Sequence, residues 1–287
     1  MGIPSYFSSV VKKHSKVLKP LSFYKPAFFS NLYMDCNSII YDAVHEINRR
    51  RETIESIESI ETIESIETIE NEIIECVIIK IEEYIKLIQP SNTIYIAFDG
   101  VAPLAKMNQQ RTRRYKGDYV ETRNYSKSTS GSSLTWSTLN ITPGTQFMQN
   151  LSRLIKAHFD NNVGLYGAQK LIVSASDVKG EGEHKIFQYI REINNTDENI
   201  LIYGLDSDLI MLTIFNRQYY NKGFIFREAP SFLSIDSEIT PDEKEPYVVD
   251  IDLMCNELAV EMDCSGTDKR RVCDYVLMCF LLGNDFL

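Results

Sequence analysis

The chain has 287 residues, 44% of them hydrophobic and 24% charged, which is enough for one large globular domain or two small ones. Its formal net charge of −10 would argue against a nucleic-acid partner, but residues 52–75 carry nine glutamates and no Lys, Arg or His. Taking those nine charges from −10 leaves −1, so net charge does not exclude a nucleic-acid substrate.

Four short apolar runs, rich in β-branched and aromatic residues, predict strands. In chain order they are NLYMD (31–35), TIYIAFD (93–99), KLIVSAS (170–176) and ILIYGLD (200–206). Apolar periodicity predicts helices at residues 37–50, 72–89, 104–124, 145–159, 182–194 and 267–282. In the segment ITPGTQFMQNL we expect Thr142 to be the N-cap of a helix and Pro143 its first residue.

The predicted strands do not alternate apolar and polar residues, and helices separate them. This pattern is typical of a parallel sheet that is buried on both faces. The sequence therefore predicts an α/β fold with a mostly parallel central sheet flanked by helices on both faces. In such a sheet, ligands bind in the crevice outside the carboxyl ends of the strands.

Residues 52–72 contain a triplet repeat, Ile-Glu-Ser/Thr. A period of three matches neither a strand nor the apolar stripe of an α-helix, so a core-facing helix could not use these isoleucines over the full length. We interpret the repeat as a low-complexity insertion within a helix or loop. A Ser/Thr-rich segment at 126–140 and an acidic segment at 234–246 are predicted linkers.

Acidic residues stand where the predicted strands end. Asp35, Asp99 and Asp206 end three of the runs, and the fourth is followed by the glycine-rich turn KGEGE. Each acid alone could cap a helix or lie in a turn. Together they predict one metal site at the carboxyl edge of the sheet, because uncompensated carboxylates there would repel one another. The expected ligands and catalytic residues are Asp35, Asp99, Glu181, Glu183, Asp206, Asp208 and Asp285.

An all-carboxylate site suits a hard divalent cation, which favours Mg²⁺, with Mn²⁺ as a substitute. His184 lies beside Glu183 in the sequence and could act as a base. A surface position, or a contact with a ligand rather than with the metal, is the alternative for this histidine.

The helix predicted after Asp99 is basic on one face. Its residues Lys106, Gln110, Arg113 and Arg114 recur at helical spacing, with Arg111 and Lys116 nearby. A charged run of this kind can be an ordinary solvated helix face. Because the helix starts at the same sheet edge as the carboxylates, we interpret it as a phosphate-binding face. Metal ions that activate water beside cations that hold a strand would suit phosphodiester hydrolysis.

The six cysteines form no C-x-x-C motif and no zinc-ligand spacing, which predicts free thiols in a reducing compartment. The N-terminus has no apolar core of signal-peptide length, and Tyr6 stands where myristoylation requires Ser or Thr. No stretch approaches the ~18 apolar residues that span a bilayer. We expect a soluble intracellular protein, cytoplasmic or nuclear, with no secretion and no membrane association.

Seven segments resemble the N-terminal conserved region of the XRN family of 5′→3′ exoribonucleases. They are MGIPSYF, MDCNSIIYD, DGVAPLAKMNQQRTRRYK, ITPGTQFM, SDVKGEGEHKIFQYIR, YGLDSDLIMLT and LLGNDFL, and they span residues 1–287. The resemblance implies one nuclease domain related to flap nucleases and PIN domains, two Mg²⁺ ions, and degradation of single-stranded RNA. It also implies that Lys106, Gln110, Arg113 and Arg114 bind a 5′-monophosphate. Tyr41 stands where the family has a histidine that stacks on the 5′ nucleotide.

Two departures from the family pattern lead to further expectations. The repeat lengthens the segment between the first two catalytic strands, and the sequence stops before the family's second conserved region. We therefore expect Asp285 to be the least firmly held ligand, and a second chain could supply the missing region. The alternatives to an exoribonuclease are a flap-type or PIN-type nuclease cutting structured DNA or RNA, and a truncated, non-catalytic RNA-binding protein.

Overall fold

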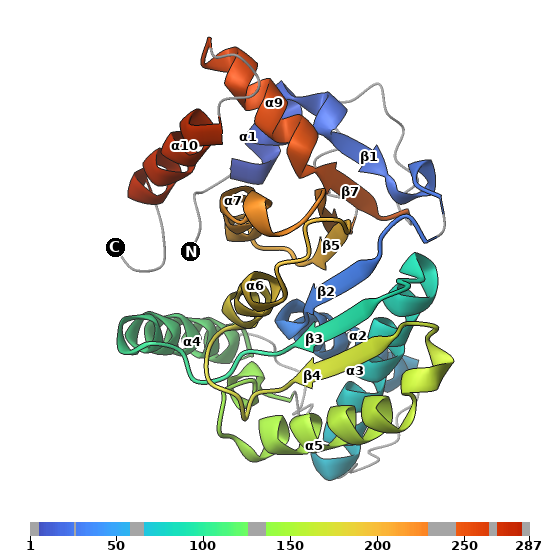
Figure 1. Cartoon of the computed structure of the whole chain (residues 1–287). Helices are drawn as coiled ribbons and strands as arrows, with labels where there is room; N and C mark the ends of the chain where they lie inside the picture. Colours follow the sequence, from blue (N-terminus) through green and yellow to red (C-terminus); the bar gives the residue numbers. More distant parts are fainter. Residues whose placement is uncertain are drawn as a thin grey trace.

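The computed structural model describes residues 6–25, 27–57, 66–125, 136–228, 245–263 and 269–282. Within these ranges a seven-stranded sheet of order β1-β7-β6-β5-β2-β3-β4 forms the centre of the molecule (Figure 1). The strands are β1 (Leu18–Pro20), β2 (Asn31–Asp35), β3 (Thr93–Ala97), β4 (Lys170–Ser174), β5 (Ile200–Tyr203), β6 (Gly223–Arg227) and β7 (Tyr247–Asp250).

Five neighbouring strands, from β4 through β3, β2 and β5 to β6, run parallel. The two strands at the other edge, β7 and β1, are antiparallel. The predicted α/β fold with a mostly parallel sheet is confirmed. The sequence did not predict β6, β7 or β1; β1 and β7 have only three and four residues.

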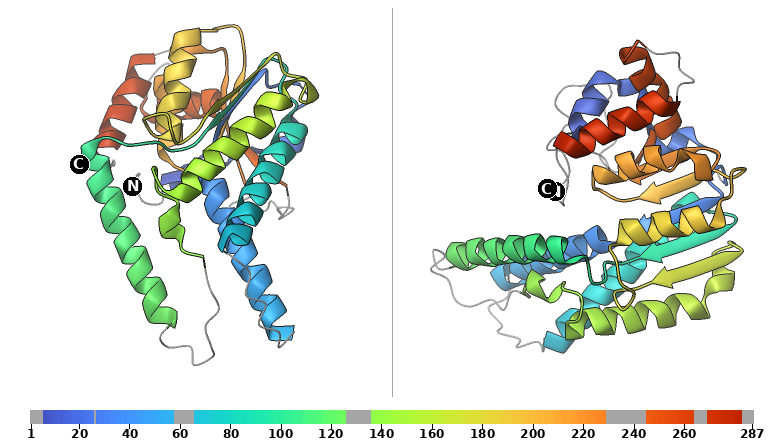
Figure 2. Two further views of the ribbon diagram at one scale, coloured as in Figure 1. Left: turned by 90° about the horizontal axis from the view of Figure 1, so that it is seen from below. Right: turned by 60° about the vertical axis from the view of Figure 1, so that its left-hand side comes forward.

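One face of the sheet is covered by α2 (Asn37–Ile57), α3 (Ile66–Ile88) and α5 (Gln146–Asn161) (Figures 1 and 2). Side chains such as Leu32 and Met34 point to this face and pack in a core with the isoleucines of α3 and with Phe147 and Phe159 of α5. The strands bury both faces, which explains why they show no alternation of apolar and polar residues.

The other face is covered by α1 (Tyr6–Lys13), α6 (Gly182–Ile193), α7 (Asp208–Phe215), α9 (Ile251–Glu261) and α10 (Lys269–Leu282). Tyr33, Ile202 and Ile225 point to this face and pack against Ile186 of α6 and Leu209 of α7. No helix in the described ranges combines the length and the apolar character needed to cross a bilayer.

Helix α4 (Leu104–Tyr125) projects away from the sheet, as both views of Figure 2 show. Its N-terminal turns lie beside α6, where they contribute to the site described below. The start of α5 differs from the expectation that Thr142 caps this helix. Gly144 adopts a left-handed φ of +96°, so the helix begins only after it, with Thr145 as the N-cap accepting a hydrogen bond from the Met148 amide. Thr142 instead donates its hydroxyl to the Leu139 carbonyl oxygen at 2.7 Å.

Helices α2 and α3 contain part of the triplet repeat. Residues 52–57 belong to α2 and residues 66–72 to α3, whereas 58–65 lie outside the described residues. The side chain of Ile69 is 3% exposed and packs in the core, whereas Ile66 is 61% exposed. Most of the two predicted linkers, residues 126–135 and 234–244, also lies outside the described residues.

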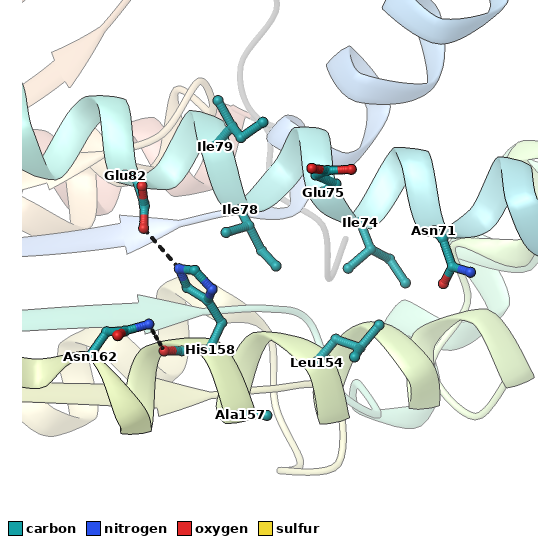
Figure 3. Close-up of a pocket in the computed structure, with 10 residues that line it drawn as sticks. All are labelled: Asn71, Ile74, Glu75, Ile78, Ile79, Glu82, Leu154, Ala157, His158 and Asn162. Atoms are coloured by element: carbon teal, nitrogen blue, oxygen red, sulfur yellow. Dashed lines mark hydrogen bonds and ion pairs between the residues drawn. The ribbon is translucent and has the colours of Figure 1, made fainter.

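A groove of about 600 Å³ runs between α3 and α5 (Figure 3). Ile74, Ile78 and Leu154 face the gap, and one end is closed by His158, whose Nε2 lies 2.8 Å from Glu82 Oε1. The groove is on the opposite face of the sheet from α6. It is therefore separate from the carboxylates described next.

Candidate metal and phosphate site

Asp35 is the last residue of β2, the strand that lies between β3 and β5 in the parallel part of the sheet. Two glycines pack closely around its side chain. A Cβ at residue 182 would overlap Asp35 Oδ1, and a Cβ at residue 204 would contact the Asp35 Cβ at 3.6 Å. Glycine at position 182 therefore lets α6 begin directly over the end of β2.

Asp99, two residues beyond β3, is fixed on both sides. Asn37 Nδ2 donates to Asp99 Oδ2 at 2.6 Å, and the Asp99 amide donates to Asn37 Oδ1 at 3.0 Å. The Gly182 amide donates to Asp99 Oδ1 at 2.8 Å. The loop after β3 is thereby tied to the starts of α2 and α6.

Glu181 is the N-cap of α6, and Glu183 and His184 lie in its first turn. One ligand atom from each of these three residues lies within 4.8 Å of the other two. His184 Nδ1 is 3.5 Å from Glu181 Oε2 and 3.8 Å from Glu183 Oε1. The histidine therefore contacts the carboxylates directly, closer to them than the sequence indicated.

Lys185, the next residue of α6, is buried and points beneath the site. Its ammonium donates to the Phe98 carbonyl oxygen at 2.8 Å and to the Ala175 carbonyl oxygen at 2.9 Å. Burial lowers the pKa of Lys185 to about 8, against the effect of the nearby acids. This side chain joins the ends of β3 and β4 to α6.

Asp206 follows β5, and Asp208 is the first residue of α7. Asp285 lies outside the described residues, so its position in the site stays a prediction. The other six predicted carboxylates come from four segments, and we call them the carboxylate cluster. Its members are Asp35, Asp99, Glu181, Glu183, Asp206 and Asp208.

The charges of the carboxylate cluster act on one another. Burial, reinforced by the charges of Asp99, Glu183 and Asp206, raises the pKa of Asp35 well above its usual range. Burial likewise raises the pKa of Glu183 to about 7, with Glu181, Asp206 and Asp208 adding to the effect. Without a cation, Asp35 and Glu183 keep their protons to a higher pH than carboxyl groups ordinarily do.

The N-terminal part of α4 faces the carboxylate cluster. Lys106 Nζ lies 3.0 Å from Glu181 Oε1, and Gln110 Nε2 donates to the same oxygen at 3.5 Å. Burial raises the pKa of Glu181, but hydrogen bonds from His184 and Lys106 outweigh it, so the net shift is downward. Cationic and anionic parts of the site therefore meet at Glu181.

Farther along α4, the arginine side chains are more open to solvent. Arg114 is half-buried and close enough to Tyr41 and Asp99 for their charges to influence its pKa, which burial lowers. Arg113 is exposed. Tyr41, on α2, is half-buried and packs against the core on the face of the sheet that α2, α3 and α5 cover. We call Lys106, Gln110, Arg113 and Arg114 the basic face of α4.

A family model described as the XRN 5′-3′ exonuclease N-terminus matches residues 1–229. The chain belongs to the XRN 5′-3′ exonuclease family. It is 29% identical to 5′-3′ exoribonuclease 1 of Saccharomyces cerevisiae, with all of this chain and 19% of that protein covered. It is 27% identical to 5′-3′ exoribonuclease 2 of Kluyveromyces lactis and 26% identical to 5′-3′ exoribonuclease 2 of Arabidopsis thaliana, again over the whole chain and 34% of each relative.

The chain thus spans between about a fifth and a third of the length of these XRN relatives. The family match confirms the resemblance drawn from the sequence motifs. It covers the residues of the carboxylate cluster and of the basic face of α4.

The residues of this XRN chain fit a bound cation. Asp35 Oδ1 is buried and has no hydrogen-bond partner within the described part of the chain, and the buried Glu181 Oε2 lies 3.5 Å from His184 Nδ1. Leaving charged oxygens buried without a partner is unfavourable, and a metal ion would supply one. The donor set is dominated by carboxylate oxygens, which suits a hard divalent cation. A metal-dependent nuclease family is implied, and a buried acidic cluster is present.

Sequence reasoning missed two residues that hold the site together, Asn37 and Lys185. A signal existed for Asn37, because it lies two residues after Asp35 at the start of a predicted helix, where asparagine commonly accepts or donates local hydrogen bonds. No pattern distinguished Lys185 from an exposed lysine, since its role depends on how α6 lies over β3 and β4.

Proposed function

We propose that this chain is the nuclease part of a metal-dependent 5′→3′ exoribonuclease that hydrolyses single-stranded RNA from a 5′-monophosphate end. The observation that carries the proposal is the meeting of the basic face of α4 and the carboxylate cluster at Glu181. A terminal phosphate held by the first would place the adjacent phosphodiester bond near the second. The exoribonuclease names of the relatives support an RNA substrate.

We propose Mg²⁺ as the bound cation, with two ions in the site and Mn²⁺ able to replace them. Carboxylate oxygens are the donors that Mg²⁺ prefers, and the six described carboxylates come from segments that the fold brings to the same place. Asp35, Asp99, Glu183, Asp206 and Asp208 would hold the ions together with Glu181, and Asp285 is a further candidate. Bound Mg²⁺ supplies an activated water and stabilises the leaving oxygen.

The protein residues would divide the remaining work. Arg113 and Arg114 would hold the 5′-phosphate with bidentate hydrogen bonds, and Gln110 would donate a further one. Lys106 would add positive charge on the side nearest the cluster. Tyr41, half-buried near Arg114, would stack on the first base. Asn37 would keep Asp99 in position through its pair of hydrogen bonds.

The two alternatives receive less support. A flap-type or PIN-type nuclease that cuts structured substrates has no need for a pocket that recognises a 5′-phosphate. A non-catalytic RNA-binding protein would have no reason to keep six carboxylates whose burial, reinforced by mutual repulsion, raises the pKa of Asp35 and Glu183. We also propose an intracellular location, cytoplasmic or nuclear, which the free thiols of Cys36 and Cys255 support.

The rest of the XRN relatives' length has no counterpart in these 287 residues. We propose that structure equivalent to it, in the same polypeptide or from a second chain, completes the RNA channel. Stacking of bases on that additional structure would be worth ~1–3 kcal/mol per base. Without it, the 287-residue chain should hold RNA weakly and release it between cleavage steps.

A time course on 3′-labelled RNA with Mg²⁺ tests the proposed function. Three substrates that differ only in their 5′ end, with a monophosphate, a hydroxyl or a triphosphate, would be compared. We expect cleavage that needs the metal, proceeds from the 5′ end and is fastest for the monophosphate. Cleavage at internal positions, or equal rates on all three ends, would contradict the proposal.

A further inference from the structure

Arg227 lies in the same row of the sheet as Asp35. Phe226 of β6 pairs with Tyr203 of β5, which in turn pairs with Met34 of β2, so the next residue on β6 is level with the next residue on β2. Two strand intervals of ~4.8 Å put the two backbones about 10 Å apart. Because side chains alternate along a strand, Arg227 and Asp35 leave the same face of the sheet.

The guanidinium of Arg227 lies over an aromatic ring. Its central carbon lies 3.7 Å from the centroid of the Phe7 ring, on α1. A cation over an aromatic face is attracted by the ring and loses the freedom to rotate. Phe7, one of the residues of the N-terminal MGIPSYF motif, is 6% exposed and therefore a firm support.

This guanidinium is not neutralised by a neighbouring acid. Its Nε is buried and lacks a hydrogen-bond partner among the residues that the structure describes. The acidic groups whose charges reach it are Asp206 and Glu228, yet neither makes an ion pair with it in the described ranges. Glu228 accepts a hydrogen bond from Tyr84 instead. Arginine stays charged at any ordinary pH, so a partly buried and unpaired one lacks its usual partner.

The position of Arg227 shows where an anionic partner would lie. The basic face of α4 lies on the β3 side of the carboxylate cluster, where Arg114 approaches Asp99. Arg227 lies on the β6 side, three strand intervals from β3, which corresponds to ~14 Å. An anion bound there would be separate from a phosphate bound at α4. The two cationic sites would flank the carboxylates from opposite sides.

We propose that Arg227, held in place by Phe7, binds a backbone phosphate of the RNA strand several nucleotides from its 5′ end. The inference rests on the proposed function, because it assumes that the strand crosses the carboxylate cluster from α4 towards β6. A planar guanidinium suits the oxygens of a phosphodiester. The contact would keep the strand across the cluster, so that RNA of sufficient length binds more tightly than a dinucleotide.

Binding of RNA of two lengths in EDTA tests this subsite, because metal-mediated effects are then absent. The ligands are a 5′-phosphorylated dinucleotide and a 5′-phosphorylated decanucleotide. For Arg227→Gln we expect about tenfold or more weaker binding of the decanucleotide, with the dinucleotide unchanged. The slope of log affinity against log salt should fall by about 0.7 for the lost phosphate contact.

Four further variants sharpen the comparison. Arg227→Lys keeps the charge but loses the planar fork, and Phe7→Leu keeps the arginine but removes the ring beneath it, so both should give smaller losses confined to the decanucleotide. Arg153→Gln removes the same charge from an exposed position on α5, on the other face of the sheet, and should change neither affinity. Arg113→Ala should weaken both ligands. Thermal unfolding identifies any variant that fails to fold. If Arg227→Gln fails to fold, the RNA affinities of Arg227→Lys decide the question.

Several results would overturn the inference. Equal losses for both lengths would make Arg227 a general support of the fold. Unchanged RNA affinity in EDTA, combined with a higher Mg²⁺ requirement in cleavage, would mean that Arg227 acts only on Asp206. If the wild-type chain showed no preference for 5′-phosphorylated over 5′-hydroxyl RNA, the proposed function itself would fail. Normal wild-type preference with an unaffected Arg227→Gln variant would reject this subsite alone.

Discussion

Lys106 and Glu181 form a buried ion pair, with Nζ and Oε1 3.0 Å apart and side chains that are 9% and 6% exposed. The lysine belongs to the basic face of α4 and the glutamate to the carboxylate cluster, so the two parts of the site share this contact. A phosphate that attracts Lys106 would leave Glu181 without its ion-pair partner, and a cation that attracts Glu181 would do the same to Lys106. Binding of the 5′-phosphate and of the metal should therefore be energetically linked.

Replacing a cluster carboxylate should abolish cleavage and leave RNA binding nearly intact. We expect this of Glu183→Gln and of Asp208→Asn, since these side chains are proposed to hold ions rather than the strand. Cleavage rates over a range of Mg²⁺ and Mn²⁺ concentrations, with RNA binding curves measured in parallel, check the expectation. Wild-type rates in the double variant would refute the assignment of the metal site.

Arg113→Ala should reduce the preference for 5′-phosphate over 5′-hydroxyl RNA. Hydrogen bonds to charged groups contribute ~1.5–3 kcal/mol, so the preference should fall by about tenfold or more. Arg113 is exposed, and its loss should not affect folding. Rate constants for the two RNA ends provide the measurement. If both substrates slow equally, the basic face contacts the backbone in general rather than the terminal phosphate.

Gly182→Ala should displace Asp35 without unfolding the protein. The added Cβ would overlap Asp35 Oδ1, whose side chain must then move, together with the start of α6. A shift of about 1 Å in a reacting geometry can lower a rate ~10²-fold. Gly117→Ala is the matched control, because a Cβ there meets nothing within 4 Å. Equal activity of the two variants would show that Asp35 has room to adjust.

The stability of the metal-free protein should fall as the pH rises towards neutrality. Burial raises the pKa of Glu183 from 4.5 to about 7, and Asp35 shifts in the same direction, so between these values the folded state holds more protons than the unfolded chain. The free energy of unfolding should decrease by at most ~1.4 kcal/mol per pH unit for each such group. Denaturant titrations in EDTA at pH 5 to 8 measure the slope.

Two controls accompany this pH series. Glu183→Gln should have a shallower slope, because one of the proton-binding groups is gone. Mg²⁺ should restore stability most strongly above pH 7, where it no longer competes with protons for the carboxylates. A slope that is the same in wild type and Glu183→Gln would mean that this carboxyl titrates normally.

Within the triplet repeat, one isoleucine should matter far more than its neighbour. Ile69→Ala should lower the free energy of unfolding by ~2–5 kcal/mol, because its side chain is buried in the core. Ile66→Ala, one triplet earlier on the same helix, should change it by less than about 0.5 kcal/mol because that side chain is exposed. Denaturant titration of both variants decides the question. A similar effect of the two substitutions would mean that the repeat is uniformly exposed or uniformly packed.

The buried side chain of Ile69 shows that the last triplets of the repeat contribute to the core. Of the repeat isoleucines whose side chains the structure describes, Ile69 reaches the core and Ile66 does not, which fits the drift that a period of three requires. A sequence pattern predicts the drift but not the point at which an isoleucine reaches the core.

The parallel strands could be predicted because burial on both faces leaves a continuous apolar run, as in TIYIA. The same reasoning overlooked β6, whose run GFIFR begins with a glycine and ends in an arginine. It also chose the wrong N-cap for α5, because by sequence Thr142, followed by Pro143, is as good a cap as Thr145. The decisive factor was the left-handed backbone of Gly144.

Within the candidate site, the sequence predicted which carboxylates would follow the strands but not what surrounds them. The positions of Asp35 and Asp206 at the edge of the sheet follow from topology alone, because each lies at or just after the end of a parallel strand. By contrast, the contacts of Lys185, and the stacking of Arg227 on Phe7, join residues that are 87 and 220 positions apart. Such pairings follow from the packing of helices onto the sheet, which has no local signature in the sequence.

The central place of β2 has a consequence for how the protein folds. This strand pairs with β3, some 60 residues later in the chain, and with β5, about 170 residues later. Contacts between such distant segments form slowly, because long loops must close first. The carboxylates meet only after both pairings exist, so a metal ion has nothing to bind before that stage. We therefore expect Mg²⁺ to slow unfolding and to leave the folding rate almost unchanged. The ion would stabilise the folded protein without taking part in its assembly.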